Sequence, residues 1–251
     1  MPQCDSNPSQ KPIPLAGFLI LDKPAGISSM KAVAIVRRLA GGIKTGHAGT
    51  LDPLATGVLV LGLGKGTKHL QTLMDTDKRY HTIIDLSAFT NTDDMEGERE
   101  KIDLPDPLPN ENAIDAALKN FRGDIMQSPP AFSAVKIGGR RAYKMARKGQ
   151  SVEIPPRQVC VHGLEILQYE WPRVEIAIHC AKGFYVRSLA RDLGMALGTG
   201  GHCVSIRRTA VGPFVIENAI TLEDVPDPLG QTDLLTIDHG LEMVRQGDGG
   251  A

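Results

Sequence analysis

Short apolar runs and alternating apolar and polar positions predict several strands in this chain. The predicted strands cover residues 17–21, 57–63, 78–86, 159–168, 173–181 and 203–210. The first two are short continuous apolar runs, which are typical of buried strands. In the run 173–181, Val174, Ile176 and Ile178 alternate with polar or small residues, so one face of that strand is expected to be buried.

Apolar residues at helical spacing predict helices between these strands. The predicted helices cover residues 28–40, 67–74, 111–121, 140–148 and 186–197. Ser28 or Ser29 is a suitable N-cap for the first helix, and Gly41 and Gly42 end it. Because helices and strands do not alternate as regular βαβ units, the pattern favours an α+β fold around a mixed sheet.

The chain divides into a leader, one domain and a tail. Residues 1–16 are polar and proline-rich and are predicted to form a flexible leader, 17–225 a single domain, and 226–251 a short tail. The acidic segment 88–110 is predicted to be a loop. No apolar run reaches the roughly 20 residues of a membrane span, and nothing resembles a signal peptide, so a cytoplasmic protein is expected.

Cysteine spacing and composition exclude some classes of site. Cys4, Cys160, Cys180 and Cys203 form no CxxC pair, so a structural zinc site of that type has no support and reduced cytosolic thiols are expected. With 41% hydrophobic and 23% charged residues, the composition is that of an ordinary globular protein.

The net charge of −1 hides two segments of opposite sign. Residues 136–157 contain seven Lys and Arg against one Glu, whereas residues 85–115 contain ten Asp and Glu against two basic residues. The basic segment is either a solvated surface or an element that neutralises phosphates.

The glycine-rich segment 45–57 is the most unusual stretch of the chain. It contains one His and one Asp, yet the sequence has no GxxxxGK[ST], GxGxxG, GxSxG or HExxH motif. What remains is the carboxylate of Asp52, which Pro53 restricts in conformation. Asp52 either caps a turn or acts as a nucleophile or charge stabiliser at an electrophilic carbon.

An ionised Asp52 would require a nearby cation. The candidates are Lys23, Lys68, Arg187, Arg207 and Arg208. Arg187 is favoured because it lies where a strand passes into a helix. Tyr80 and Tyr185 also lie at element ends, where they either stack on bases or pack against the core.

Six segments in order resemble the TruB-type family of tRNA pseudouridine synthases. They are GFLILDKPAGISS (17–29), GHAGTLDPLATG (46–57), DKRY (77–80), SPPAFSAVKIGGRRAY (128–143), KGFYVR (182–187) and IRR (206–208). The resemblance covers roughly residues 17–225. It implies the pseudouridine synthase fold, a mixed and largely antiparallel sheet with surrounding helices and a central RNA-binding cleft.

The resemblance also implies an activity and site residues. The family isomerises the uridine at position 55 in the tRNA T-loop without a cofactor or metal, by N1–C1′ cleavage, uracil reorientation and C5–C1′ bond formation. Asp52 matches the catalytic aspartate, Arg187 its partner and Tyr80 the residue that stacks on the uracil. The other expected substrate-binding residues are His47, Tyr185, Ile206, Lys23, Lys136, Arg140 and Arg141.

Three functions are thus to be compared. The first is a T-loop uridine isomerase that binds the T-arm of tRNA; it is expected to be a monomer and not to associate with a membrane. The second is a related synthase that acts on another RNA or needs a guide RNA and partner proteins. The third is a non-catalytic RNA-binding or chaperone module. Many family members carry a further C-terminal PUA domain, for which the 26 residues after Val225 are too few.

Overall fold

The computed structural model describes most of the 251-residue chain. The described residues are 15–133, 136–137, 140–141, 145 and 154–247. The predicted leader therefore lies outside the described residues, apart from Leu15 and Ala16.

One mixed sheet of ten strands organises the described part of the molecule. Its strands are β1 (Gly17–Lys23), β2 (Thr45–His47), β3 (Thr56–Leu63), β4 (Lys78–Asp85), β7 (Gly123–Gln127), β10 (Arg157–Glu170), β11 (Arg173–Cys180), β12 (His202–Val211), β13 (Phe214–Val215) and β14 (Ile220–Thr221). The order is β14-β1-β3-β12-β4-β11-β10-β7, with β2 beside β3 and β13 beside β12. Among its described pairs only β1–β14 and β3–β12 are parallel, which confirms the predicted mixed, largely antiparallel α+β architecture.

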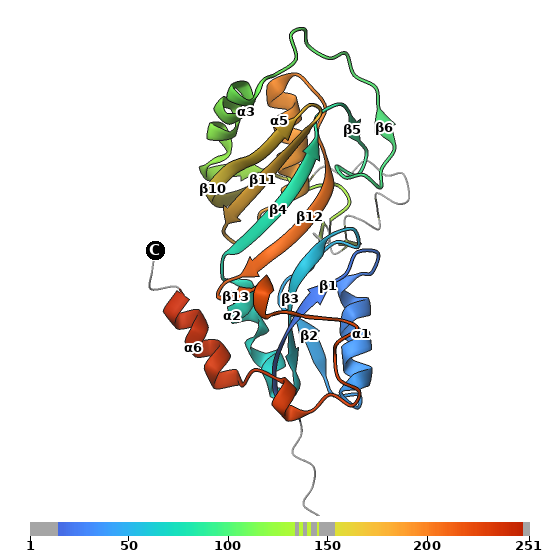
Figure 1. Cartoon of the computed structure of the whole chain (residues 1–251), viewed down its shortest axis with the longest axis vertical. Coiled ribbons are helices and arrows are strands. Elements are labelled where there is room, and N and C mark those ends of the chain that lie inside the picture. The colour runs from blue at the N-terminus through green and yellow to red at the C-terminus, as the bar shows by residue number, and fades with distance from the viewer. Residues whose placement is uncertain (1–14, 134–135, 138–139, 142–144, 146–153, 248–251) are drawn as a thin grey trace, which may run out of the picture.

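Helices pack at both ends of this sheet (Figure 1). They are α1 (Ser29–Leu39), α2 (Leu70–Met74), α3 (Glu111–Leu118), α5 (Val186–Leu197) and α6 (Ile237–Gly247). At what we call the α5 end, α5 lies against β12 and β4, and α3 lies against α5 and β10. At the α1 end, α1 and α2 lie beside β1, β2 and β3. Strands β4 and β12 run side by side from one end to the other.

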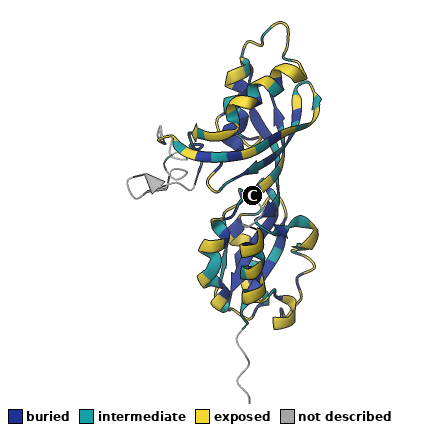
Figure 2. Cartoon of the chain, turned by 90° about the vertical axis from the view of Figure 1, so that its left-hand side faces the viewer, coloured by how far each residue is buried: buried dark blue, intermediate teal, exposed yellow. Residues whose placement is uncertain are grey.

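The core is continuous between the two ends. One cluster joins Leu21 and Leu61 at the α1 end to Ile176 and Leu189 at the α5 end, and a smaller cluster surrounds Phe18. Figure 2 shows buried strands between helices whose outer faces are exposed. The two ends thus share one sheet and one main core.

Local sequence signals account for the helices beside the site. The side chain of Ser28 accepts a hydrogen bond from the Lys31 N–H at 3.2 Å, which caps α1 as predicted. Helix α5 has the predicted bounds and ends at Gly198, whose φ of 68° is one that glycine adopts without strain.

Several elements differ from the sequence-based prediction. The predicted loop 88–110 contains a small hairpin of β5 (Phe89–Thr90) and β6 (Arg99–Glu100). Strand β7 was missed because, as an edge strand, it buries little besides Gln127 and shows no apolar alternation. The helix predicted over 140–148 is wrong at its start, since β9 (Arg140–Arg141) pairs with β8 (Lys136–Ile137). Most of the rest of that range lies outside the described residues.

The predicted tail is partly ordered against the sheet. Phe18 and Leu235 exchange backbone hydrogen bonds of 2.8 and 2.9 Å. Gly240 of α6 lies so close to the Phe18 ring that a Cβ there would come within 2.6 Å of it. Helix α6 was not predicted, although Ile237, Leu241 and Val244 are spaced as one helical face. Its buried positions are Gly240 and Val244, and Val244 belongs to the cluster that surrounds Phe18.

The described helices include none that is both long and apolar enough to cross a membrane.

Candidate active site

A cavity of about 560 Å³ lies between the α1 end and the α5 end of the sheet. Six of the residues selected from the sequence line it, namely Asp52, Tyr80, Tyr185, Arg187, Ile206 and Arg208. They come from the β2–β3 loop, β4, α5 and the residue before it, and β12. The fold therefore gathers side chains from four separate segments of the chain into one cavity.

Residues 23–29, which run from the end of β1 to the start of α1, hold the loop that carries Asp52. The Ser29 hydroxyl donates to the Leu51 carbonyl at 2.9 Å and accepts from the Leu51 N–H at 2.8 Å. On the other side of Asp52, the Pro53 carbonyl accepts from the Gly26 N–H at 2.9 Å and from Lys23 Nζ at 3.4 Å. Asp52 is thus fixed from both neighbouring residues, while its side chain remains 38% exposed.

Two glycines let this loop approach β12 closely. Gly57 has a φ of 99°, and a Cβ there would lie 2.2 Å from the Arg208 carbonyl oxygen. Gly49 has a φ of 90°, and its carbonyl accepts from Arg208 Nη2 at 3.1 Å. The glycine-rich composition of this segment therefore serves a tight backbone path rather than a phosphate cradle.

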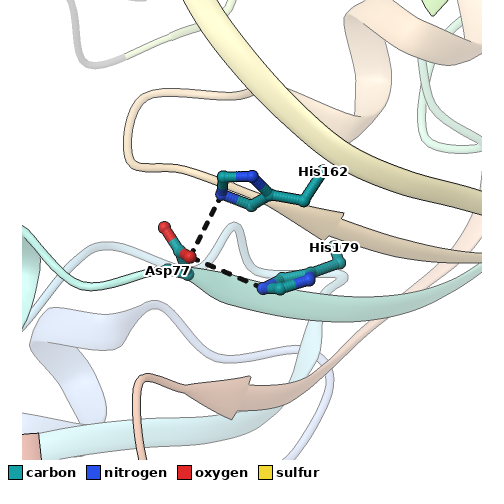
Figure 3. Close-up of side chains that lie close together, drawn as sticks. All are labelled: Asp77, His162 and His179. Carbon is teal, nitrogen blue, oxygen red and sulfur yellow. Dashed lines mark ion pairs between the residues drawn. The ribbon is translucent and has the colours of Figure 1, made fainter. Parts of the chain in front are cut away.

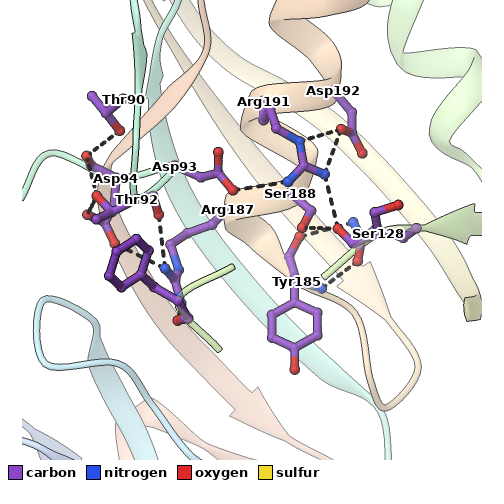
Figure 4. A network of polar contacts seen from close by, with 12 residues as sticks. Thr90, Thr92, Asp93, Asp94, Ser128, Tyr185, Arg187, Ser188, Arg191 and Asp192 are labelled. Atoms are coloured by element: carbon purple, nitrogen blue, oxygen red, sulfur yellow. Dashed lines mark hydrogen bonds and ion pairs between the residues drawn. The ribbon is translucent and has the colours of Figure 1, made fainter. Parts of the chain in front are cut away.

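Arg187 joins Asp52 to the rest of the site. Its Nη2 lies 2.8 Å from Asp52 Oδ2, and its Nη1 lies 3.4 Å from Oδ2 of the buried Asp94. The same guanidinium donates to the carbonyls of Thr92 at 3.0 Å and Phe132 at 2.9 Å (Figure 4). With only 5% of its side chain exposed, Arg187 has a single orientation that presents one edge to Asp52.

A second arginine on α5 supports the first. Arg191 pairs with Asp93 at 3.1 Å and with Asp192 at 2.9 Å, and it donates to the Ser128 carbonyl at 3.0 Å (Figure 4). Burial raises the pKa of Asp93 and of Asp192, and Arg191 opposes that shift. Part of the acidic segment that was predicted to be a loop is therefore a buried support for Arg187.

Tyr80 lies on the floor of the cavity between β11 and β12. Its register partner on β12 is Arg208, a buried side chain that donates from Nε to the Val58 carbonyl at 2.7 Å. Burial raises the pKa of Tyr80, so the phenol keeps its proton near neutral pH. Ile206 on the same strand as Arg208 is buried and lines the cavity beside them.

Tyr185 forms the wall at the α5 end. Its backbone N–H donates to Gln127 Oε1 at 2.8 Å, and Gln127 Nε2 donates to its carbonyl at 3.1 Å. The Arg157 guanidinium carbon lies 4.8 Å from the centroid of the Tyr185 ring. The ring is therefore held by its backbone and covered by a cation.

The lining of the cavity is cationic, although the whole chain has a net charge of −1. Lys78, Arg157, Lys182, Arg187 and Arg208 line it, against the carboxylates Asp52 and Asp75. Lys182 pairs with Asp75 at 2.9 Å, and burial lowers the pKa of Lys78 to about 8. A polyanion that approached the cavity would therefore meet a positively charged surface, although the chain as a whole is not basic.

The structure separates the five candidate cations for Asp52. Arg187 is its ion-pair partner, whereas Arg207 pairs with Asp22 at 2.7 Å. Lys68 lines a different, smaller pocket, and Arg208 contacts the loop backbone. Lys23 is fully buried and donates to the carbonyls of Pro24 and Ile27 at 2.7 and 2.8 Å, so it supports the loop instead of lining the cavity.

Other expected substrate-binding residues lie elsewhere or are not fully described. His47 belongs to β2 and does not line the cavity; burial lowers its pKa, as does the nearby Arg208. The pair of strands β8 and β9 contains Lys136, Arg140 and Arg141. The structure describes the backbone of these residues but not their side chains. Their predicted role in RNA binding stays a prediction.

Several site residues were missed or undervalued by the sequence analysis. Asp94, Gln127 and Arg157 contact Arg187 or Tyr185. Asp94 comes from a segment predicted as a loop, Gln127 from a stretch with no predicted element, and Arg157 was counted only as part of the basic segment 136–157. Gln127 is the buried residue of the edge strand β7, which shows no apolar alternation, so the local sequence carried no signal for it. A separate group of Asp77, His162 and His179 lies outside the cavity lining and has the donor types of a metal site.

Comparison with known proteins identifies the family of the chain. Residues 37–186 match the family model of the TruB family pseudouridylate synthase (N terminal domain), and residues 187–236 match that of the tRNA pseudouridylate synthase B C-terminal domain. A tRNA pseudouridine synthase B of Corynebacterium diphtheriae is 48% identical over 218 residues, which are 84% of this chain and 73% of that protein. One of Dinoroseobacter shibae is 47% identical over 232 residues, covering 90% and 76% respectively.

Solved structures show the same fold. A chain in the crystal structure of a Cbf5-Nop10-Gar1 complex superimposes with a TM-score of 0.65 at 31% identity, covering 92% of this chain and 59% of that one. A structure of an H/ACA RNP bound to a substrate RNA containing 2′-deoxyuridine gives 0.61 at 29% identity, covering 92% and 55%. The fold is therefore that of the pseudouridine synthases, and the chain belongs to the TruB family of pseudouridylate synthases.

Proposed function

We propose that this enzyme isomerises the uridine at position 55 in the T-loop of tRNA to pseudouridine. The observation that carries the proposal is the Asp52–Arg187 ion pair at 2.8 Å in a cavity also lined by Tyr80, Tyr185 and Ile206. The relatives that match most of the chain are named for tRNA, which supports this substrate class.

The reaction needs no co-reactant. The N1–C1′ bond of uridine breaks, the uracil turns, and a C5–C1′ bond forms, while C5 loses its hydrogen to solvent and N1 gains one. An ionised Asp52 serves each of three routes: attack at C1′, attack at C6, or proton removal to a glycal. Arg187 orients the carboxylate and balances its charge.

The surrounding residues suit a flipped base. Tyr80 offers a ring for stacking on the uracil and a protonated phenol that relays the C5 proton. Tyr185 and Ile206 supply further apolar contact, which offsets the loss of base stacking, on the order of a few kcal/mol. The cations around the cavity attract the RNA backbone, and His47 with the β8–β9 hairpin extends the proposed contact.

A tritium-release assay tests the proposal. Unmodified tRNA transcript with [5-³H]uridine is incubated with the purified protein alone, and the control transcript carries cytidine in place of uridine 55. We expect release with the first transcript and background with the second. Release from both transcripts would contradict the position, and release from neither would contradict the activity.

A related synthase that requires a guide RNA and partner proteins is the second candidate. The likeness to chains from the Cbf5-Nop10-Gar1 and H/ACA RNP structures favours testing it. The same assay separates the two, because turnover by the protein alone requires no guide.

We expect the active enzyme to be a monomer. Gel filtration tests this, because the elution volume of the active fractions gives the size of the active species.

A further inference from the structure

A cluster of two histidines and one aspartate lies on the surface beside the cavity, apart from the catalytic residues (Figure 3). Its members are Asp77, just before β4, His162 on β10 and His179 on β11. Their side chains are 37–46% exposed. The reaction proposed above uses none of them.

A β-bulge places His162 in the cluster. On β10, Val161 and Gly163 pair with the consecutive residues Cys180 and His179 of β11, so His162 is an extra residue in the ladder. Such bulges redirect a side chain relative to its regular neighbours. On β11 the alternate residues Ile178 and Cys180 are buried, which leaves His179 on the face away from that core.

The donor atoms are spaced as ligands of one metal ion would be. His162 Nε2 lies 3.1 Å and His179 Nε2 lies 3.5 Å from the same Asp77 oxygen, Oδ2. Tetrahedral zinc with bonds of about 2.0–2.1 Å holds neighbouring ligand atoms roughly 3.3 Å apart. All three donor atoms lie within 4.8 Å of one another, so a small ring rotation closes the third edge.

We propose that Asp77, His162 and His179 bind one divalent transition-metal ion of the zinc type, with water at the remaining position. Two imidazole nitrogens and one carboxylate oxygen form the donor set that Zn²⁺ accepts at open sites. The bound ion joins the segment that precedes β4 to the β10–β11 hairpin. Strand β4 is the strand that carries Tyr80. The ion acts as a structural clamp at the rim of the cavity.

The neighbouring thiol is outside the proposed coordination shell. Cys160 Sγ lies 3.8 Å from His162 Nδ1, the ring nitrogen on the other side from the one that faces Asp77. Cys160 therefore supports the ring orientation and does not ligate the ion. The site accordingly consists of three protein ligands.

Calorimetric titration of the untagged, chelator-treated protein with ZnCl₂ tests the site. We expect one equivalent to bind, and the melting temperature to rise by roughly 5 °C or more at 100-fold excess over Kd. Co²⁺ should give the visible absorption of a low-symmetry four- or five-coordinate site. No saturable binding of one equivalent would overturn the proposal, leaving only an ion-pair cluster.

Matched variants locate the ion. Asp77→Asn, His162→Gln and His179→Gln should each weaken Zn²⁺ binding about 10-fold or more. His81→Gln is the control, because His81 on β4 is a similarly exposed histidine paired with Glu175 at 3.6 Å, and it should leave binding unchanged. Cys160→Ser should also bind normally. Loss of binding in either control, or normal binding in all three ligand variants, would refute the assignment; circular dichroism verifies that each variant folds.

Discussion

The Ser29 hydroxyl makes hydrogen bonds to both the N–H and the carbonyl of Leu51, the residue before Asp52. Ser29 belongs to the first turn of α1 and is 22 positions away in the sequence. Through this contact, a helix at one end of the sheet fixes the backbone of the proposed catalytic aspartate.

Ser29→Ala tests this support. It leaves two buried backbone groups of Leu51 without their partner, at a cost of about 1–3 kcal/mol in the free energy of unfolding. We expect kcat to fall about 10- to 100-fold because Asp52 is less well positioned. Urea unfolding and tritium release measure the two effects.

Ser28→Ala is the matched control for that variant. Ser28 caps α1 but makes no contact with Leu51 among its described hydrogen bonds. Its loss should cost about 1 kcal/mol in stability with kcat unchanged. Equal losses of kcat in the two variants would argue against a specific role of Ser29.

Asp52→Asn separates chemistry from RNA binding. The amide keeps the size of the carboxylate and accepts a hydrogen bond from Arg187, yet it has no negative charge. We expect turnover at background while the Kd for tRNA is unchanged or slightly lower, as measured by filter binding. Residual activity close to wild type would remove Asp52 from its proposed role.

Asp94→Asn tests the electrostatic support of Arg187. Asp94 is buried and pairs with Arg187, so neutralising it alters how the guanidinium presents itself to Asp52. We expect kcat to fall about 10-fold or more, with a smaller change in KM.

Asp93→Asn is the neighbouring control for Asp94→Asn. Asp93 pairs with Arg191 and has a φ of 60°, a conformation that asparagine tolerates well. Because burial already raises the pKa of Asp93, the neutral side chain is less costly there. A larger loss of kcat in Asp93→Asn than in Asp94→Asn would contradict the assigned order of support.

Lys23 predicts a pH dependence of stability. Burial lowers its pKa from 10.5 to about 8, although the charge of Asp52 acts in the opposite direction. Between these values the unfolded chain holds the proton that the folded one has lost, so stability rises with pH in that window. Below pH 8 this contribution is absent.

Comparison with Lys23→Met isolates that contribution. The other titrating groups are common to both proteins, so the wild type should gain up to about 3 kcal/mol relative to the variant as pH rises from 8 towards 10.5. Urea unfolding at several pH values measures it. A difference that is constant or falls with pH would contradict the buried, proton-releasing Lys23.

The sequence predicted the sheet and most helices because their residues repeat with the period of the element they form. Asp52 could be selected by its setting, but residue type alone left five cations as partners. The position of Arg187 between a strand and a helix favoured it, and so did the resemblance. Asp94 lies in an acidic segment typical of a solvated loop, and its burial depends on the distant α5. The bulge at His162 likewise arises from pairing between strands and leaves no trace in the local sequence.

Strands β4 and β12 run through the region between the α1 end and the α5 end, which we call the waist of the molecule. Their residues Tyr80 and Ile206 line the cavity there. A hinge at that waist would have to break ladder hydrogen bonds in the strands that hold the site. The two ends are therefore expected to move as one body, and closure around a substrate is left to side chains and loops. If the protein is rigid in this way, the RNA has to make the larger conformational change, because its target loop must deform to enter a cavity that already has its final shape.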